Sequence, residues 1–370
     1  MLRAPRFRLF VAACLLAAAV TYPLVACCPA PRLNQWAVNA DQTVIMIWDP
    51  SAKRQHFIRQ ANFETDDKDF GFLIPSPSQP ELAESGNEAF QTLKDITAPR
   101  HVAMPARETG GGCACSKVET AKGAAAKPDV RVLEEKLVAG FNAAVLEADD
   151  ADVLVTWLKD HGYAFSPAIA EWAKPYVEQG WKITALKVAP PAPAEGPEGT
   201  PTDAETTKTV KAGALRLSFD TERPLFPYRE PDYAKVAGDN VEHQKKLARA
   251  QRLLRIYFLS NARFQGDLTP EQPWTGRAVW AGKVPEHLRT HLLTQLQLPA
   301  DTGPAEFHLT EFEDRWPYKV APADVYFAAA QDQEDVRRPD VYVYQESSGD
   351  VSVAILFAVA CVPLLLRRKK

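Results

Sequence analysis

The chain has 370 residues, 46% of them hydrophobic, with 43 Lys and Arg against 47 Asp and Glu and a net charge of −4. Seven of the cations lie in two terminal segments, so residues 29–349 hold 36 cations and 46 acids and have a net charge of −10. An acidic body without a basic stripe argues against nucleic acid as a partner, because phosphate contacts dominate that affinity, and against binding to the face of an anionic membrane.

The N-terminal segment has the pattern of an export signal. Three arginines within the first eight residues precede an apolar run from Leu9 to Ala26, and a basic start, an apolar stretch and a small final residue are typical of signal peptides. We therefore expect residues 1–26 to be a signal peptide. The sequence LVA before Cys27 also fits a bacterial lipobox, in which Cys27 becomes lipidated, and both interpretations cleave at the same place.

The C-terminal segment has the pattern of a membrane anchor. The apolar run VSVAILFAVACVPLLL, residues 351–366, is followed by four consecutive cations. Its length as a helix, roughly 24 Å, is slightly short for a hydrocarbon core of about 30 Å, and flanking residues can supply the difference. We expect a transmembrane helix over residues 350–366 and a basic cytoplasmic tail over residues 367–370. A sorting signal that is removed after export stays open, and both interpretations place the body outside the cytoplasm.

Residues 27–188 form the first half of the expected extracytoplasmic domain. Runs rich in β-branched and aromatic residues predict strands at 43–49, 56–63, 69–75 and 181–188, and two more over 130–148 joined near Gly140. Periodic apolar residues predict helices at 86–96, from 151 to Gly162 after the capping residues Asp149 and Asp150, and from Pro167 after Ser166. Residues 98–128 are expected to be a long loop.

Residues 189–212 are expected to be a disordered linker, because they contain no aromatic residue and Val210 is their one larger aliphatic. The second half of the domain, residues 213–346, predicts a helix at 284–296 and strands at 215–219, 255–264 and 277–282 and in HLTEFEDRW, DVYFAAA and VYVYQ. Strands outnumber helices and come in hairpin-like pairs. The predicted fold class is therefore α+β, mainly antiparallel sheets with a few packed helices, plus the signal helix and the transmembrane helix.

Several segments together resemble a bacterial family, the domain of unknown function 2330. They are CCPAP, NADQTVIMIWDP, DFGFLIPSPSQPELAESGNEAFQTL, WLKDHGY, YVEQGW, GALRLSF, PLFPYRE and LRIYFLSNARF, in this order. The resemblance covers most of the chain from residue 27 to about residue 265. It implies an exported, anchored, cysteine-bearing protein, and it supplies no reaction and no catalytic residues.

Four cysteines of the expected body form two clusters, Cys27 with Cys28 and Cys113 with Cys115. In an oxidising compartment these most simply form two disulfides. Neighbouring cysteines resist bridging each other, so pairing across the two clusters is the arrangement with low strain. Closing a loop of about 86 residues would stabilise the fold by roughly 4 to 5 kcal/mol in the chain-entropy model. Lipidation of Cys27 would leave an odd thiol.

Two other interpretations of these cysteines stay open. A four-cysteine zinc site usually has C-x2-C spacing, which neither cluster has. A redox couple is compatible with the CxC spacing, but no thioredoxin-like context surrounds it. The disulfide interpretation is the one we carry forward.

No other pattern indicates chemistry. His287 and His291 share a helix face, but a metalloprotease motif is absent and a solvated polar face is the simpler interpretation. Asp149, Asp150 and Asp152 fit a helix cap better than a calcium loop. We therefore nominate no catalytic, cofactor-binding or metal-binding residue and no cofactor.

The sequence favours a single-pass protein of the cell membrane whose extracytoplasmic body binds or scaffolds at the cell surface without catalysis. The membrane is its one expected partner, through the C-terminal helix, and the protein or cell-surface partner is unknown. The alternative is an exported enzyme whose site shows no motif. A convergent polar cluster in a deep pocket would separate the two hypotheses.

Overall fold

The computed structural model describes residues 28–30, 37–65, 71–105, 131–163, 167–188, 208–211, 214–232, 240–242, 244–245, 251–269, 272–317, 321 and 323–345. The chain divides into two compact units. The first takes residues 1–96 and 119–336, and the second takes residues 97–118 and 337–370.

The first unit is built around a sheet with the strand order β16-β17-β13-β2-β3-β11-β5, in which β10 also pairs with β3. Its strands are β2 (Ala37–Asp49), β3 (Arg54–Thr65), β5 (Glu81–Ser85), β10 (Lys208–Lys211), β11 (Ala214–Asp220), β13 (Gln251–Ser260), β16 (Arg277–Val284) and β17 (Phe307–Pro317). All its pairs are antiparallel except β2 with β13, which are parallel. Strands from before and after the expected linker therefore alternate within one sheet.

Two smaller sheets belong to the same unit. One has the order β1-β4-β9-β8-β7 and the other the order β12-β18-β14-β15, and all their pairs are antiparallel. Their strands are β1 (Cys28–Ala30), β4 (Gly71–Ser76), β7 (Arg131–Val138), β8 (Phe141–Glu147), β9 (Lys182–Val188), β12 (Leu225–Phe226), β14 (Phe264–Thr269), β15 (Gln272–Pro273) and β18 (Val325–Ala329).

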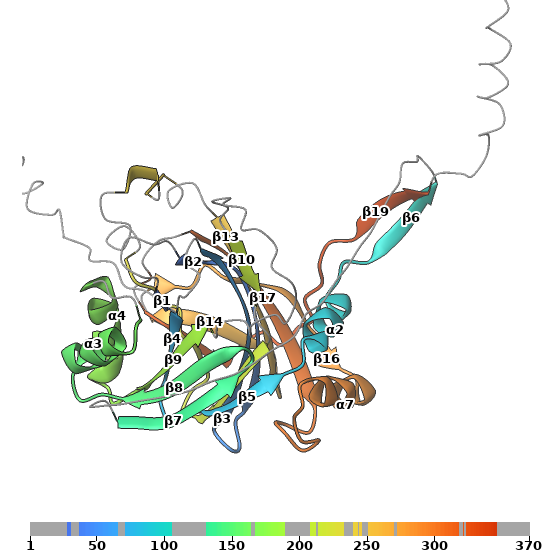
Figure 1. The fold of residues 1–370 in the computed structure, drawn as a ribbon. Helices are drawn as coiled ribbons and strands as arrows, with labels where there is room; N and C mark the ends of the chain where they lie inside the picture. The colour runs from blue at the N-terminus through green and yellow to red at the C-terminus, as the bar shows by residue number, and fades with distance from the viewer. Residues whose placement is uncertain are drawn as a thin grey trace, which may run out of the picture. The chain divides into compact units, whose positions relative to one another are not determined.

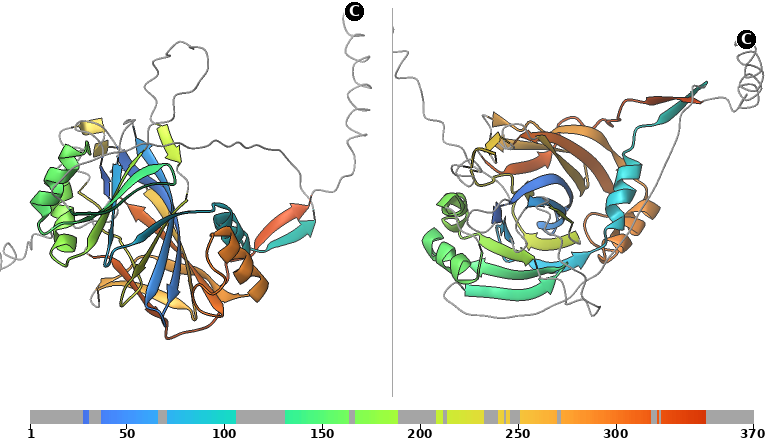
Figure 2. Two further views of the ribbon diagram at one scale, coloured as in Figure 1. Left: turned by 60° about the horizontal axis from the view of Figure 1, so that its bottom comes forward. Right: turned by 45° about the horizontal axis from the view of Figure 1, so that its top comes forward.

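Alternation along the strands produces three apolar layers, because successive side chains point to opposite faces. In β2, Val44 and Met46 belong to a central core shared by all three sheets, whereas Ile45 and Ile47 pack with two helices, α2 (Glu88–Ile96) and α7 (Glu286–Gln295). The helices α3 (Ala151–Asp160) and α4 (Pro167–Val177) cover the far face of the five-stranded sheet. Figures 1 and 2 show α3 beside α4 and α2 beside α7.

The ends of α3 confirm the predicted cap. The Asp150 side chain accepts a hydrogen bond from the backbone N–H of Asp152, so it satisfies a free donor of the first turn. The helix ends before Gly162, whose φ of 72° is in the left-handed region that glycine adopts without strain.

The second unit contains a two-stranded ribbon, β6 (His101–Pro105) paired in parallel with β19 (Val341–Gln345). The register places Val341 opposite His101, and the ribbon begins with a hydrogen bond from the Val341 N–H to the Arg100 carbonyl.

The α+β fold class with mostly antiparallel sheets is confirmed, and four helices are present in the described part of the chain. Three expectations differ from the structure. The strand expected over residues 255–264 is divided between β13, which ends at Ser260, and β14, which begins at Phe264. β6 lies in the segment expected to be a loop, and β10 occupies residues expected to belong to the linker. Both strands pair with distant segments, and such pairing overrides the weak local propensity of a polar or alanine-rich stretch.

Among the described residues, no helix is both long and apolar enough to cross a membrane. The expected signal peptide (residues 1–26) and the expected transmembrane helix (residues 350–366) lie outside the described residues.

Candidate functional site

A short segment in the core, residues 225–230, collects hydrogen bonds from side chains far away in the sequence. We call it the 225–230 segment. Five side chains form hydrogen bonds with it, namely Gln55, Trp172, Arg252, Asp314 and Asp324. Tyr176 and Trp274 donate hydrogen bonds to Asp324 and Asp314, and we call all of these side chains, together with the segment, the polar cluster. The side chains come from β3, α4, β13, β17 and the segments before β16 and β18, so the cluster joins α4 to the large sheet and to the segments that lead into β16 and β18.

Side chains satisfy much of the backbone of the 225–230 segment, of which just two residues form β12. The Gln55 amide donates to the Leu225 carbonyl and accepts from the Leu225 N–H, each at 2.8 Å. Asp324 Oδ1 accepts from the N–H groups of Tyr228 and Arg229 at 2.9 and 3.1 Å, and Trp172 Nε1 donates to the Arg229 carbonyl at 3.0 Å. Buried backbone groups need such partners, so these side chains stabilise the conformation of the segment in an interior without water.

Asp314 gathers donors from three residues. Its carboxylate accepts hydrogen bonds from Tyr228 Oη at 2.6 Å, Trp274 Nε1 at 3.2 Å and Thr275 Oγ1 at 3.0 Å. Burial raises the pKa of Tyr228 far above its usual range, and the negative charge of Asp314 raises it further. The Tyr228 hydroxyl therefore stays protonated and acts as a donor, not as a base.

Trp274 reaches Asp314 because the chain beside it is glycine. A Cβ atom on Gly276 would lie 2.3 Å from the Trp274 ring, a distance that no real contact allows. Gly276 therefore permits the indole to lie flat against the backbone with its N–H toward Asp314.

Asp324 and Glu230 are the other two buried carboxylates of the cluster. Burial raises the pKa of Asp324, while Arg229 and the hydrogen bonds from Tyr176 and the backbone act against that shift. Arg252 binds Glu230 with both terminal nitrogens, one of them at 2.8 Å, and the two side chains are 3% and 2% exposed. This fork pairs the two buried charges, whose separation would leave an uncompensated charge in the interior.

Two further polar side chains lie on the inner face of the large sheet near the cluster. The register places Gln42 beside Leu254 and Leu254 beside Asp314, while Arg59 lies diagonally across from Gln42 on β3. The Arg59 guanidinium lies over the Phe72 ring, 5.4 Å from its centre. The Gln42 side chain is 1% exposed, and its amide atoms make no hydrogen bond.

The cluster is arranged for holding and not for reacting. Its acids, hydroxyl and indoles bind one another or the backbone, and the named side chains are buried. A reaction needs a group that can meet a substrate, so the geometry indicates a structural latch between α4 and the sheets.

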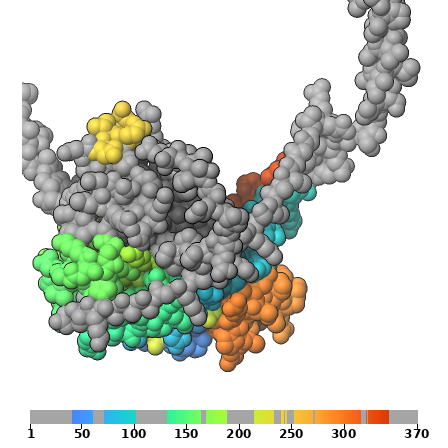
Figure 3. Space-filling model, in the orientation of Figure 1, coloured from blue at the N-terminus to red at the C-terminus, as the bar shows by residue number. Residues whose placement is uncertain are grey.

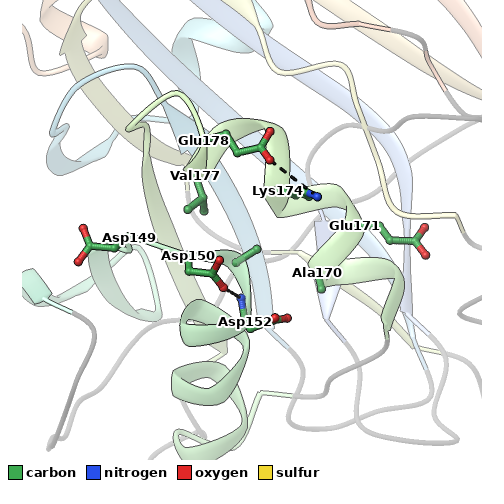
Figure 4. A pocket seen from close by; sticks show the side chains of 9 residues that line it. Asp149, Asp150, Asp152, Ala170, Glu171, Lys174, Val177 and Glu178 are labelled. Atoms are coloured by element: carbon green, nitrogen blue, oxygen red, sulfur yellow. Dashed lines mark hydrogen bonds and ion pairs between the residues drawn. The ribbon is translucent and has the colours of Figure 1, made fainter.

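A hollow of about 260 Å³ lies between the N-terminal end of α3 and the side of α4 (Figure 4). Five carboxylates line it, on Asp149, Asp150, Asp152, Glu171 and Glu178, together with Ala151, Ala170, Lys174 and Val177. The two helices lie at the surface in Figure 3 (green).

The acids of this hollow do not converge. Asp150 caps α3, Lys174 lies 3.8 Å from Glu178, and Asp149 and Glu171 point to opposite sides in Figure 4. No group of three or more metal-ligating side chains occurs in the part of the chain that the structure describes.

A buried His–Ser pair lies on the outer face of the large sheet. His56 Nδ1 is 2.8 Å from Ser218 Oγ, on directly paired residues of β3 and β11. Burial, which is the largest cause, and the charges of Arg54 and Arg216 together lower the pKa of His56 to about 4, against an opposing effect of Asp49. The imidazole is neutral at pH 7, and Ser218 is 4% exposed.

Sequence reasoning missed both constellations, because their hydrogen bonds join residues far apart in the sequence, such as Gln55 and Leu225, which are 170 residues apart. The segment PLFPYRE offered the nearest signal, because Arg229 and Glu230 follow directly on apolar and aromatic residues. The register that joins His56 to Ser218 leaves no local signal at all.

The structure places several of the residues singled out in the sequence. His287 and His291 are exposed on α7, which confirms a solvated polar face. Cys28 begins β1 opposite Leu73, whereas Cys27, Cys113 and Cys115 lie outside the described residues. The disulfide and lipidation hypotheses therefore stay predictions.

Comparison with known proteins identifies a family. The model of the DUF2330 family, described as an uncharacterized protein conserved in bacteria, matches residues 23–284. No curated protein matches the chain, and no solved structure matches it. The family match covers more than half of the chain, including the 225–230 segment and its partners up to Thr275, while Asp314 and Asp324 follow it. The chain belongs to the DUF2330 family.

Proposed function

We propose that this chain is an exported, single-pass protein of the cell membrane whose extracytoplasmic body binds or scaffolds a partner and catalyses no reaction. The two terminal apolar segments with their flanking cations support export and anchoring. The observation that carries the non-catalytic role is the polar cluster, whose carboxylates and hydroxyl are committed to hydrogen bonds that hold the fold.

Cysteine labelling tests the location of the body. Ala194→Cys places a thiol in the expected linker, and Lys370→Cys places one in the expected cytoplasmic tail. A membrane-impermeant maleimide should label the first variant in intact cells and the second variant after lysis alone, with the parent chain as the background. The reverse pattern would refute an exterior body.

Deletion of residues 351–370 tests the anchor. The product should leave the membrane fraction, unless Cys27 carries a lipid. Retention in the membrane with an acyl group on Cys27 would decide for the lipobox. Retention without any acyl group would contradict the proposed C-terminal anchor.

The His56–Ser218 pair favours a second candidate, an exported serine hydrolase. A histidine 2.8 Å from a serine hydroxyl is the contact that activates such nucleophiles. A fluorophosphonate probe would then label the chain, and Ser218→Ala would abolish the label. Because Ser218 is buried, we expect no labelling of the folded chain, which would favour the binding role.

A further inference from the structure

We propose that the β6–β19 ribbon lies in the headgroup region of the membrane's outer surface, where its exposed tyrosine contacts lipid. This inference rests on the anchoring by residues 350–366 proposed above. It adds a second, peripheral contact between the chain and the bilayer, made by a part of the fold separate from the first unit.

The composition of the ribbon suits the boundary between membrane and water. Its strands read HVAMP and VYVYQ, ten residues that contain no Asp, Glu, Lys or Arg and include two tyrosines. The body as a whole is strongly acidic, so this uncharged stretch departs from its surroundings. Tyrosine combines an apolar ring with a polar hydroxyl and is enriched where membranes meet water.

Both faces of the ribbon expose an apolar side chain. Val341 is 42% exposed and Tyr342 is 61% exposed, and both are among the few large hydrophobic residues that the described part of the chain exposes to this extent. Neighbouring residues of a strand point to opposite faces, so both faces of the ribbon present an apolar side chain to their surroundings. A docked protein would cover one face, whereas the water–lipid interface surrounds a ribbon on both.

The ribbon needs a surrounding that stabilises it. A two-stranded ribbon is marginal in water, because it has no third element on which to bury a face. The headgroup region removes apolar surface from water and still offers water and headgroup partners to the edge N–H and C=O groups. The hydrocarbon core offers no such partners, so the ribbon belongs in the interface and not in the core.

The ribbon lies close in the sequence to the proposed membrane anchor. Five residues, 346–350, separate the end of β19 from the apolar run, and they span at most roughly 18 Å. The ribbon itself is roughly 16 Å long. If residues 351–366 cross the bilayer, this segment and the strand residues from Tyr342 to Gln345 tether Tyr342 within roughly 30 Å of the hydrocarbon core, which lets the ribbon fold back onto the headgroup region.

Photo-crosslinking in cells tests the proposal with the full chain. A benzophenone amino acid replaces Tyr342 in one variant and Val153, which is 42% exposed on α3, in the control variant. Irradiation should attach phospholipid to the Tyr342 variant, detected by mass spectrometry as an added lipid mass, and should attach none to the Val153 variant.

The other outcomes overturn the proposal in distinguishable ways. Crosslinks from position 342 to a protein, including a second copy of the chain, or no lipid adduct in a chain that stays in the membrane fraction, would refute the ribbon contact alone. Recovery of the chain in the soluble fraction would refute the ribbon contact together with the anchor.

Discussion

The 225–230 segment and the β6–β19 ribbon both have few strand-to-strand hydrogen bonds, and they are stabilised in different ways. Side chains from α4, from β3 and from Asp324, which precedes β18, complete the backbone hydrogen bonds of the 225–230 segment inside the core. The ribbon consists of a single pair of strands, β6 and β19, and it exposes Val341 and Tyr342. The first segment thus depends on the fold itself, whereas we propose that the second depends on the membrane around it.

Breaking the buried ion pair should give the largest loss of stability. Glu230→Leu leaves the Arg252 charge without its main partner in a dry site, which we expect to reduce the free energy of unfolding by about 3 to 5 kcal/mol. Urea unfolding of the full chain in detergent, followed by tryptophan fluorescence, measures this change.

A double variant distinguishes the loss of the ion pair from the effect of leaving one buried charge without its partner. Glu230→Leu with Arg252→Met should recover most of the loss, because both charges of the pair are then absent and neither is left without its partner. Glu306→Leu, which breaks the exposed Lys283–Glu306 pair, is the control and should change stability by less than about 1 kcal/mol. A single variant as stable as the parent chain would show that the pair does not hold the segment.

His56 tests burial of a titratable group without a paired charge. Its pKa falls from about 6.5 in the unfolded chain to about 4 in the fold, so between these values the unfolded state binds more protons. Stability should therefore decrease as the pH falls from 6.5 to 4, by up to about 3 kcal/mol from this group.

His56→Gln is the matched variant, because glutamine does not titrate and still offers Ser218 a hydrogen bond. Unfolding measured at several pH values should show a shallower acid loss for the variant than for the parent chain. Equal slopes would mean that His56 is not buried as a neutral group.

Tyr228→Phe asks how much one donor of the polar cluster contributes. The variant keeps the ring in the core and leaves Asp314 with two of its three donors. We expect a loss of about 1 to 2 kcal/mol, since a buried acceptor loses a partner while the others remain. Parent-like stability in urea would place that hydrogen bond outside the set that fixes the segment.

The elements with strong local patterns were predictable from the sequence. The alternation around Val44 and Met46, the cap at Asp150 and the turn at Gly140 each fix an element by short-range physics, and the structure confirms the corresponding strands and helix. β6 and β12 were missed because their pairing partners lie far away in the sequence. The polar cluster was missed for the same reason, since the union of Gln55, Asp314 and Asp324 around one segment depends on sheet register.

Tyr342→Ser should give the smallest effect on folding and so complete the comparison with the 225–230 segment. The side chain is 61% exposed, and substitution of an exposed residue away from caps and buried groups changes the free energy of unfolding by about 0.5 kcal/mol or less. Urea unfolding in detergent should therefore give parent-like midpoints for the variant. Its effect should appear instead at the bilayer, where the proposed lipid contact loses an aromatic ring. In membranes, trypsin should then cut the Tyr342→Ser chain after Arg337 faster than the parent chain, with Tyr342→Trp cut at the parent rate. A large loss of stability in detergent would instead mean that Tyr342 packs within the fold, and it would contradict the assignment of the ribbon to the membrane surface.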